Sequence, residues 1–583
     1  MTDPAPRFRD KPVSFVGGRY GGCFATETTH DIGCGPLHDR VPPVAALASD
    51  YAVVPHPTRR MDGVAESVLY RIVGSSFGTT LTYDPTKTFV LTSTNQLGHV
   101  TTTVYSGVNG VTIDPATGFY GTVKSVTDPN GKVVNHEYDA LGRRTKTTAP
   151  DGLVTQMAYP TLAEFGVIGT QKISTTTSGA LLPSALTSST FFDGLGRTIK
   201  KESSGPNGTI LVTDTQYDVK GQVFRTSLPY FKTTESNVGR WRSMTYDPLG
   251  RVTQVTHPDT LSGSPVISKS CYAPFVTVTL DPSGERKRET KDAYGRVVKI
   301  EEYSTLFSTC DTTVGSPYAT TNYTYDLLGN LTKVVDTLGN RTTMRYDTLN
   351  RKLAMSDPDM STNGTSTCGD VTTITPAGTY PWYSSPCWNY QYDAAGNLTR
   401  QTDAKNQHLW FRYDGLNRRT QKDYTTQKAA GSGDVRYIYD DTVTTFNRKG
   451  RLKQAIDAAT NVTFEYDAMG RVSKNTRVLD STTYVTTSVY DGLGRLKEVT
   501  YPTSPAKTVE YLYTGPVLDK VQDKAGSGTT IYATYGSYTS QGKAQTITYG
   551  NGVVTTSAFA DPARSLRARL SMIVMPRRRA PGV

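Results

Sequence analysis

A tyrosine–aspartate pair that opens a glycine-containing turn recurs along this chain. The stretch Tyr325 to Arg351 holds one unit, and the next Tyr-Asp pair starts at Tyr346, 21 residues after Tyr325. Asp336, 11 residues after Tyr325, opens a second turn halfway through the unit. The same spacing returns between Tyr392 and Tyr413. The unit therefore reads as turn, strand, turn, strand, and few folds other than a run of hairpins can accommodate it.

The turns share the form Asp-x-x-Gly or Asp-x-x-Asn. An aspartate at the first turn position accepts hydrogen bonds from backbone N–H groups further along the turn. Gly and Asn are the residues that best tolerate positive φ, which the residue after a type I turn adopts in hairpins that contain a bulge. Fifteen such turns can be read along the chain; they begin at Asp128, Asp139, Asp193, Asp218, Asp247, Asp281, Asp292, Asp326, Asp336, Asp347, Asp393, Asp403, Asp414, Asp467 and Asp491.

The segments between turns are short and rich in Thr, Val and Tyr, which favours strands over helices. In RTTMRYD, Met344 and Tyr346 fall on one face while Arg345 and Asp347 fall on the other. We therefore predict an all-β protein, an array of antiparallel β-hairpins. The 36 Tyr against 17 Phe, a hydrophobic content of 36%, 52 Gly and 32 Pro indicate a thin, extended sheet with many turns rather than a thick core.

The regularly placed tyrosines admit two interpretations. They stack on cross-strand neighbours and stabilise the sheet, or they form exposed rows that bind carbohydrate or a partner surface. Because the tyrosine keeps a fixed distance from its turn, the structural interpretation is preferred.

The net charge of +11 comes largely from arginines that follow turn glycines, and it is interpreted as a solvated face. No clustered basic stripe suggests nucleic-acid binding. No window of about 18 apolar residues predicts a membrane span. The first residues, MTDPAPRFRDK, do not resemble a signal peptide.

Three domains are expected. Residues 1–65 form an irregular N-terminal segment, 66–560 the repeat sheet, and 561–583 a basic tail that departs from the pattern. A membrane-surface or nucleic-acid role for the tail is an alternative. The segments 304–321 and 357–388 interrupt the repeat and are expected to be loops. Cys368 and Cys387 flank the second of them and either pair or remain free thiols.

No catalytic, cofactor-binding or metal-binding constellation stands out, and no enzyme is predicted. Ser76 lies in a G-x-S-x-G match, but strand-forming residues follow it where a nucleophile elbow needs a helix. The spacing of Cys23, His30, Cys34 and His38 matches no common zinc pattern. The other histidines, His99, His136, His257 and His408 among them, are scattered over separate units.

The repeated motif resembles the YD repeats of the Rhs family, which also occur in wall-associated bacterial proteins and in teneurins. The residues that carry the resemblance are predicted to be structural: Tyr138, Asp139, Gly142, Tyr246, Asp247, Gly250, Tyr325, Asp326, Gly329, Tyr346, Asp347, Tyr392, Asp393, Gly396, Tyr413, Asp414, Tyr466, Asp467, Gly470, Tyr490, Asp491 and Gly494. The stretch YDPTKTFVLTSTNQLGHVTT (83–102) is similar to bacterial insecticidal toxin-complex proteins.

The resemblance implies a curved or spiral sheet that closes into a hollow shell around a C-terminal toxin. It implies a toxin or effector cargo and delivery-machine proteins as partners. It also implies a secreted or cell-surface protein that is cytoplasmic before delivery.

Two features of the family are absent from this sequence. The family's self-cleaving core motif has the form Asp-Pro-x-Gly-Leu, but the Asp-Pro-x-Gly stretches at Asp128, Asp247 and Asp281 are followed by Lys, Arg and Glu. No toxin domain follows the repeats. The predicted function is therefore a non-catalytic, partial shell that carries a toxin or effector. The alternative is a cell-surface adhesion module that binds glycans or a partner protein.

Overall fold

Backbone pairing between neighbouring strands organises the described chain. The computed structural model describes residues 54–59, 65–72, 75–114, 118–161, 164, 171–258, 266–304, 309–311, 315–359, 361–362, 366–367, 370–372, 387–524, 530–561 and 566–573. Within them, 41 strands form one sheet, and β26 and β27 form a separate two-stranded sheet. The prediction of an all-β array of antiparallel hairpins is confirmed.

The strands of the first half are β1 (Val54–Arg59), β2 (Ala65–Ile72), β3 (Ser75–Tyr83), β4 (Val90–Thr94), β5 (Val100–Tyr105), β6 (Val123–Thr127), β7 (Val133–Tyr138), β8 (Arg144–Thr148), β9 (Val154–Ala158), β10 (Lys172–Ser178), β11 (Leu186–Phe192), β12 (Thr198–Ser204), β13 (Ile210–Tyr217), β14 (Val223–Ser227), β15 (Tyr230–Phe231), β16 (Trp241–Tyr246), β17 (Val252–His257), β18 (Val266–Ala273), β19 (Val276–Leu280), β20 (Arg286–Lys291) and β21 (Val297–Tyr303). A short 3₁₀ turn, η2 (Pro206–Gly208), follows β12.

The strands of the second half are β22 (Ala319–Tyr325), β23 (Leu331–Val335), β24 (Arg341–Tyr346), β25 (Lys352–Ser356), β26 (Ser361–Thr362), β27 (Ser366–Thr367), β28 (Trp388–Tyr392), β29 (Leu398–Thr402), β30 (His408–Tyr413), β31 (Arg419–Tyr424), β32 (Val435–Tyr439), β33 (Leu452–Ile456), β34 (Thr460–Tyr466), β35 (Val472–Leu479), β36 (Thr482–Tyr490), β37 (Leu496–Tyr501), β38 (Lys507–Thr514), β39 (Val517–Asp523), β40 (Ile531–Tyr538), β41 (Ala544–Tyr549), β42 (Val554–Asp561) and β43 (Leu566–Ile573). The 3₁₀ turn η3 (Thr444–Phe446) follows β32.

Nearly every strand pairs with the next one in sequence. Two segments change this order: β14 pairs with β16, because β15 folds back onto β13, and β25 pairs with β28 across the insertion at 357–388. Each Tyr-Asp hairpin carries a bulge at its tyrosine. Thr324 faces Lys333, whereas Tyr325 faces Leu331, so one extra residue is accommodated beside the turn.

Little of the sheet is a packed core. Among the described residues, the buried residues that form a hydrophobic cluster are Ala354, Val371 and Cys387. Many buried side chains are polar, and they include Thr343, Gln421 and Asp423. Stability therefore rests on the pairing of strands and on polar contacts at the turns more than on burial between layers.

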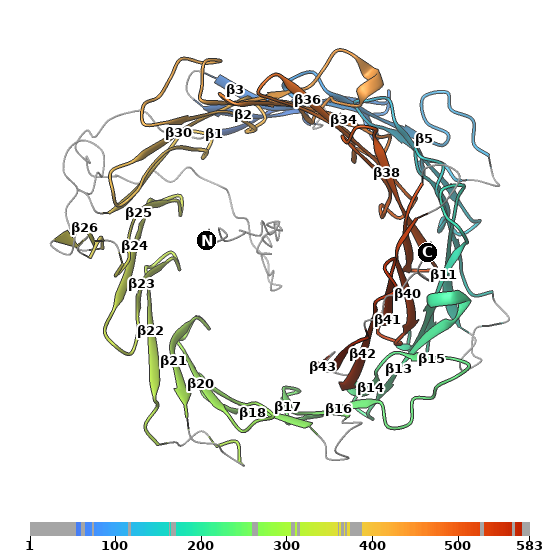
Figure 1. Ribbon diagram of the computed structural model, residues 1–583. Helices are drawn as coiled ribbons and strands as arrows, with labels where there is room; N and C mark the ends of the chain where they lie inside the picture. Colours follow the sequence, from blue (N-terminus) through green and yellow to red (C-terminus); the bar gives the residue numbers. More distant parts are fainter. Residues whose placement is uncertain are drawn as a thin grey trace, which may run out of the picture. The chain divides into compact units, whose positions relative to one another are not determined.

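The sheet is a spiral that returns beside itself. The amide of Asn130 exchanges two hydrogen bonds with the backbone of Lys449, 319 residues further on: Asn130 Nδ2 donates to the carbonyl oxygen at 3.1 Å and Lys449 N donates to Asn130 Oδ1 at 2.9 Å. Arg471 Nη2 lies 3.5 Å from Asp151 Oδ2, and Arg240 Nη1 donates to Ser540 Oγ at 3.3 Å. In Figure 1, the orange and red strands accordingly run beside the blue and green ones.

We call residues 78–400 the first coil and 401–557 the second coil. The YD edge is the sheet edge formed by turns such as those at Asp139, Asp193 and Asp491, and the far edge is formed by the alternate turns, such as those at Asp128 and Asp151. The contacts at Lys449, Arg471 and Ser540 all come from the YD edge of the second coil, and they meet the far edge of the first coil. This boundary between coils is called the seam.

Strands extend beyond the expected limits of the repeat region. β1 lies within the segment expected to be irregular, and β43 lies within the expected tail. Pro55 and Pro57 hide β1 in the sequence, but proline is tolerated on an edge strand, and the described pairing of β1 is with β2 alone. In the tail, Leu566, Ala568 and Leu570 alternate with arginines, and β43 pairs with β42. Residues 1–53 and 60–64 lie outside the described residues.

The turn at Asp193 allows a matched test of the backbone requirement. Gly196 has φ +75°, whereas Gly194 does not need positive φ, and a Cβ on either would meet nothing within 4 Å. We expect Gly196→Ala to lower the free energy of unfolding by about 1–2 kcal/mol, because L-residues are strained in the left-handed region. Gly194→Ala should leave it unchanged or raise it by about 0.5 kcal/mol. Urea unfolding measures both.

Gly196→Asn serves as the second comparison, since Asn350 and Asn417 occupy the same turn position at φ 62° and 58°. It should lose less stability than Gly196→Ala. Equal losses at positions 194 and 196 would contradict the proposed role of the backbone conformation.

Candidate functional site

The carboxylate of the first turn residue holds each YD turn together. At Asp139, Oδ1 accepts hydrogen bonds from the backbone N–H groups of Leu141 (3.0 Å) and Arg143 (2.9 Å). Oδ2 accepts one from Arg143 Nε at 2.7 Å. The backbone closes the same turn through Gly142 N to Asp139 O, at 2.9 Å. One side chain thus satisfies two backbone donors and an arginine, and the turn is fixed from within.

The turn arginine also connects its hairpin to the next one. Arg351 Nε donates to Asp347 Oδ2 at 2.7 Å, and its Nη1 donates to the backbone oxygen of Asp393, in the following YD turn, at 3.0 Å. Its guanidinium lies over the ring of Tyr392, 5.0 Å from the centroid. The tyrosine hydroxyl donates to the carbonyl oxygen of Lys352 at 2.9 Å. Each unit therefore binds its neighbour through both an arginine and a tyrosine.

The same link recurs along the YD edge. Arginine lies over the tyrosine of the next unit in the following pairs: Arg143–Tyr159, Arg197–Tyr217, Arg251–Tyr272, Arg296–Tyr325, Arg418–Tyr439, Arg451–Tyr466, Arg471–Tyr490 and Arg495–Tyr513. The prediction of a solvated arginine face holds only in part for these residues: their side chains are 16–44% exposed, but each is also engaged on two or three sides. The tyrosine rings contact the arginine of the preceding turn, a neighbour that the structural interpretation of the tyrosines did not name.

Turns that end in asparagine use a different link. Asn330 Nδ2 donates to Asp326 Oδ2 at 2.9 Å and to Asn350 Oδ1 in the next YD turn at 2.8 Å. Asn397 repeats this arrangement with Asp393 and Asn417. The asparagine at the fourth turn position, Asn350 or Asn417, therefore tolerates positive φ and also accepts a hydrogen bond from the preceding turn.

The structure places the residues of the predicted Tyr-Asp motifs on the YD edge, whereas the predicted turns at Asp128, Asp281, Asp336 and Asp403 lie on the far edge. In each unit the tyrosine ends a strand, the aspartate begins the turn, and the glycine has positive φ. The turns at Asp347 and Asp414 have Asn350 and Asn417 in the glycine position. Most tyrosine hydroxyls donate to a backbone carbonyl of the preceding hairpin, as Tyr138 does to Val123 O at 3.0 Å and Tyr490 to Val472 O at 3.1 Å. Tyr346 instead faces the sulfur of Met344.

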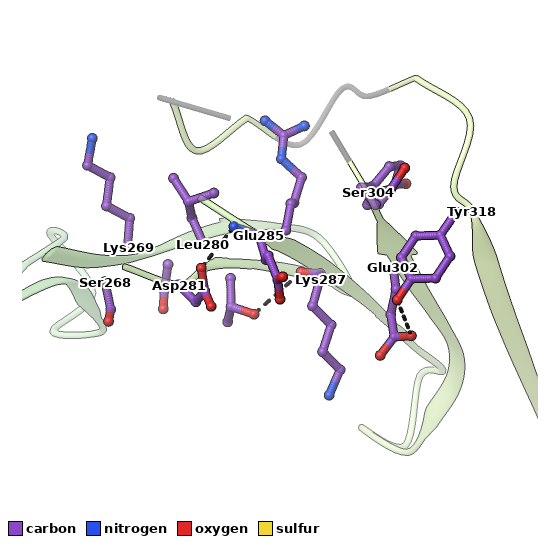
Figure 2. A pocket seen from close by; sticks show the side chains of 13 residues that line it. Ser268, Lys269, Leu280, Asp281, Glu285, Lys287, Glu302, Ser304 and Tyr318 are labelled. Atoms are coloured by element: carbon purple, nitrogen blue, oxygen red, sulfur yellow. Dashed lines mark hydrogen bonds between the residues drawn. The ribbon is translucent and has the colours of Figure 1, made fainter. Parts of the chain in front are cut away.

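A concave patch of the sheet forms a cavity of about 600 Å³. Figure 2 shows the side chains that line it, which come from β18 to β21 and from Ser304 and Tyr318 at the ends of the first insertion. Tyr318 donates to Glu302 Oε2 at 3.4 Å, and Asp281 accepts hydrogen bonds from its own turn. Charges of both signs line the cavity and several pair with neighbours. We find no nucleophile with an adjacent general base among these residues.

Comparison with known proteins identifies the repeat. A family profile described as RHS Repeat matches residues 120–154, 325–362 and 392–429, which include the five YD turns at Asp139, Asp326, Asp347, Asp393 and Asp414. The chain therefore contains RHS repeats. A profile described as IgGFc binding protein also matches, over residues 8–132. No curated protein matches the chain.

Solved structures share the fold of this Rhs-repeat chain. In the crystal structure of TcdB2-TccC3-Cdc42, 32% of the chain aligns with 90% of this one, at a TM-score of 0.67 and 15% identity. In the Photorhabdus luminescens Tc holotoxin pore with a mutated TccC3, 29% aligns with 85% of this chain, at a TM-score of 0.63 and 15% identity. The Rhs-repeat chain spans about a third of the length of these proteins. The likeness establishes a toxin-complex-like shell fold.

The other sequence candidates that lie among the described residues are not assembled into a site. Ser76 lies within β3, paired with Arg71 of β2, and a strand does not form a nucleophile elbow. His136 Nδ1 lies 3.1 Å from Thr147 Oγ1, and His99 Nε2 lies 3.1 Å from Asp440 Oδ1 at the seam. The part of the chain that the structure describes contains no group of three metal-ligating residues and no helix that could span a membrane. The candidates Cys23, His30, Cys34 and His38 lie outside it.

A disulfide links Cys271 of β18 to Cys310 in the first insertion. The two cysteines are 39 residues apart, and this spacing does not predict their pairing. The one indication in the sequence is that Cys310 lies in a segment that interrupts the repeat. The bond fastens the insertion to the sheet beside the cavity. Cys387 is also disulfide-bonded, while Cys368, its expected partner, lies outside the described residues.

Hydrogen bonds lower the pKa of many turn carboxyls. At Asp193, the backbone N–H of Arg197 is the largest cause, and it outweighs burial, which raises the pKa. At Asp441, the side chain of Arg448 is the largest cause, and the pKa falls to about 2. At Asp84, burial raises the pKa, but hydrogen bonds from the Phe89, Thr86 and Thr88 backbone and from Thr86 Oγ1 lower it to about 2. The ionised form is therefore part of the folded turn.

Replacing Arg351 with lysine tests the link between units. Lysine keeps the charge but cannot donate to Asp347 and Asp393 together while covering Tyr392. We expect Arg351→Lys to reduce the free energy of unfolding by about 1–2 kcal/mol. The exposed Arg341, at the start of β24, provides the control. Arg341→Lys should change stability by less than about 0.5 kcal/mol in the same urea titration. Equal effects would show that the link contributes little.

Lowered aspartate pKa values predict acid sensitivity. A carboxyl whose folded pKa lies below its unfolded value near 3.9 stabilises the protein above that value. This contribution disappears as pH falls through the folded pKa. We expect the urea midpoint to be steady near neutral pH and to fall steeply between about pH 4 and pH 2, because many turns take up protons together. A midpoint that stays constant down to about pH 2 would contradict this.

Proposed function

We propose that this chain is a non-catalytic structural shell that encloses a toxin or effector polypeptide for delivery. The observation that carries the proposal is the seam, because a sheet that bonds to itself after some 319 residues separates one of its faces from the surroundings. A shell needs walls that stay closed without a thick core. The links of Arg351 and its counterparts supply that closure between hairpins, and Asn130 and Arg471 supply it between coils.

A secreted destination fits the disulfide between Cys271 and Cys310, since such bonds persist in oxidising compartments. The partners proposed are the enclosed polypeptide and the proteins of a delivery complex. The alternative of an adhesion module that binds glycans through tyrosine rows is less well supported. The repeat tyrosines donate their hydroxyls to backbone oxygens, and arginines cover their rings.

Protection of a passenger tests the enclosure. An unfolded, protease-sensitive polypeptide would be fused after the last residue, and its digestion by trypsin compared with that of the same polypeptide alone. We expect digestion in the fusion to be slowed at least ~10-fold, because cleavage would require opening of the shell. Cleavage at the rate of the free polypeptide would refute enclosure.

A seam variant makes the test specific. Asn130→Ala removes both hydrogen bonds to Lys449, and Thr514→Val removes the contacts of Thr514 Oγ1 with Asn207, at 3.2 Å to its N and 3.1 Å to its Oδ1. The double variant should lose much of the protection while its hairpins remain folded by circular dichroism. Thr483→Val, on an exposed strand position, is the matched control and should protect like the wild type.

A further inference from the structure

Two identical turns show what a covered and an uncovered YD turn look like. The sequence Asp-Gly-Leu-Gly-Arg occurs at 193–197 in the first coil and at 491–495 in the second. Leu195 is 78% exposed, whereas Leu493 is 41% exposed. A Cβ on Gly492 would meet the side chains of Leu153 and Leu182 across the seam, while one on Gly194 would meet nothing within 4 Å. The same five residues are therefore docked in one place and open in the other.

The contrast extends along the whole YD edge. We call the residue two positions after the turn aspartate the tip of the turn. In the second coil, the tips Leu416 and Met469 are partly covered, and Met469 is 42% exposed. In the first coil, six tips at the same turn position form an apolar row that is 61–86% exposed, which Lys220 interrupts between Leu195 and Leu249. We call this row the tip row; it consists of Leu141, Leu195, Leu249, Tyr294, Leu328 and Leu349. An exposed apolar row of this regularity marks an interaction surface.

The seam also shows which residue types bind a YD turn. The far edge of the first coil meets YD tips with leucines and with aspartates, as Asp151 does with Arg471 at 3.5 Å and Asp128 with Arg451 at 3.7 Å. The far edge of the second coil presents the same kind of surface. Its hairpin turns begin at Asp403 and Asp457, and the neighbouring Ala458 is exposed. One chain thus carries an open YD edge and an open far edge of complementary charge.

We propose that the tip row docks on the far edge of a second copy of this chain and reproduces the seam between molecules. The two surfaces differ, so the contact is head to tail and does not close after two subunits. Association then extends the spiral from one molecule to the next. This inference concerns the outer edges of the sheet and does not depend on whether the chain encloses a cargo.

Two variants of the full-length chain, one altered at the YD edge and one at the far edge, test the proposal by analytical ultracentrifugation. Gly194→Leu with Leu195→Asp fills the open space of one tip and adds a charge that repels far-edge aspartates. Leu338→Arg with Ala458→Arg places cations at two exposed positions of the far edge. We expect the wild type to form species larger than dimers as concentration rises to ~100 µM, and each variant alone to associate at least ~10-fold more weakly.

Mixing the two variants gives the decisive result. Each retains one intact edge, so an equimolar mixture should form 1:1 dimers and stop there. A wild type that remains monomeric at ~100 µM overturns the proposal. So does a mixture that stays monomeric while the wild type associates, or a variant that associates as the wild type does. Unchanged circular dichroism and urea midpoints confirm that the variants are folded.

Discussion

The carboxylate at the start of each turn is the interaction on which the rest of this sheet depends. It accepts hydrogen bonds from two backbone N–H groups and from the turn arginine, so it fixes the turn and the arginine together. The arginine, once held, can lie over the next tyrosine and reach the next turn. Without the ionised aspartate, the guanidinium would lose its anchor, and each hairpin would be joined to its neighbour by strand pairing and the tyrosine hydroxyl alone.

This arrangement explains how a sheet of 41 strands persists with few buried apolar clusters. Each hairpin contacts mainly its neighbours, so stability accumulates along the array as it does in repeat proteins. Polar links at the YD edge hold successive units, and the seam adds contacts between distant ones. A wall built in this way can enclose space because its stability does not require another layer of residues behind it.

The local fold could be predicted from residue chemistry, whereas distant contacts could not. Aspartate, glycine and asparagine at fixed turn positions dictate the reversals, and Thr, Val and Tyr dictate the strands between them. The partners of Arg351 and Tyr392 depend on how one hairpin lies against the next, and the sequence does not encode that geometry locally. The pairing of Asn130 with Lys449 depends on the twist accumulated over many strands. β1 and β43 lack turn motifs, so only their pairing reveals them.

The separation between seam partners also has a consequence for biosynthesis. Hairpins involve residues close in sequence and can form as soon as they leave the ribosome, whereas Asn130 must wait for the synthesis of Lys449, 319 residues later. During that interval the far edge of the first coil lacks its seam partners, because the second coil has not yet been synthesised. Translation therefore sets the order of assembly: the hairpins form one after another, and the edges of the two coils become joined only after the second coil has been synthesised.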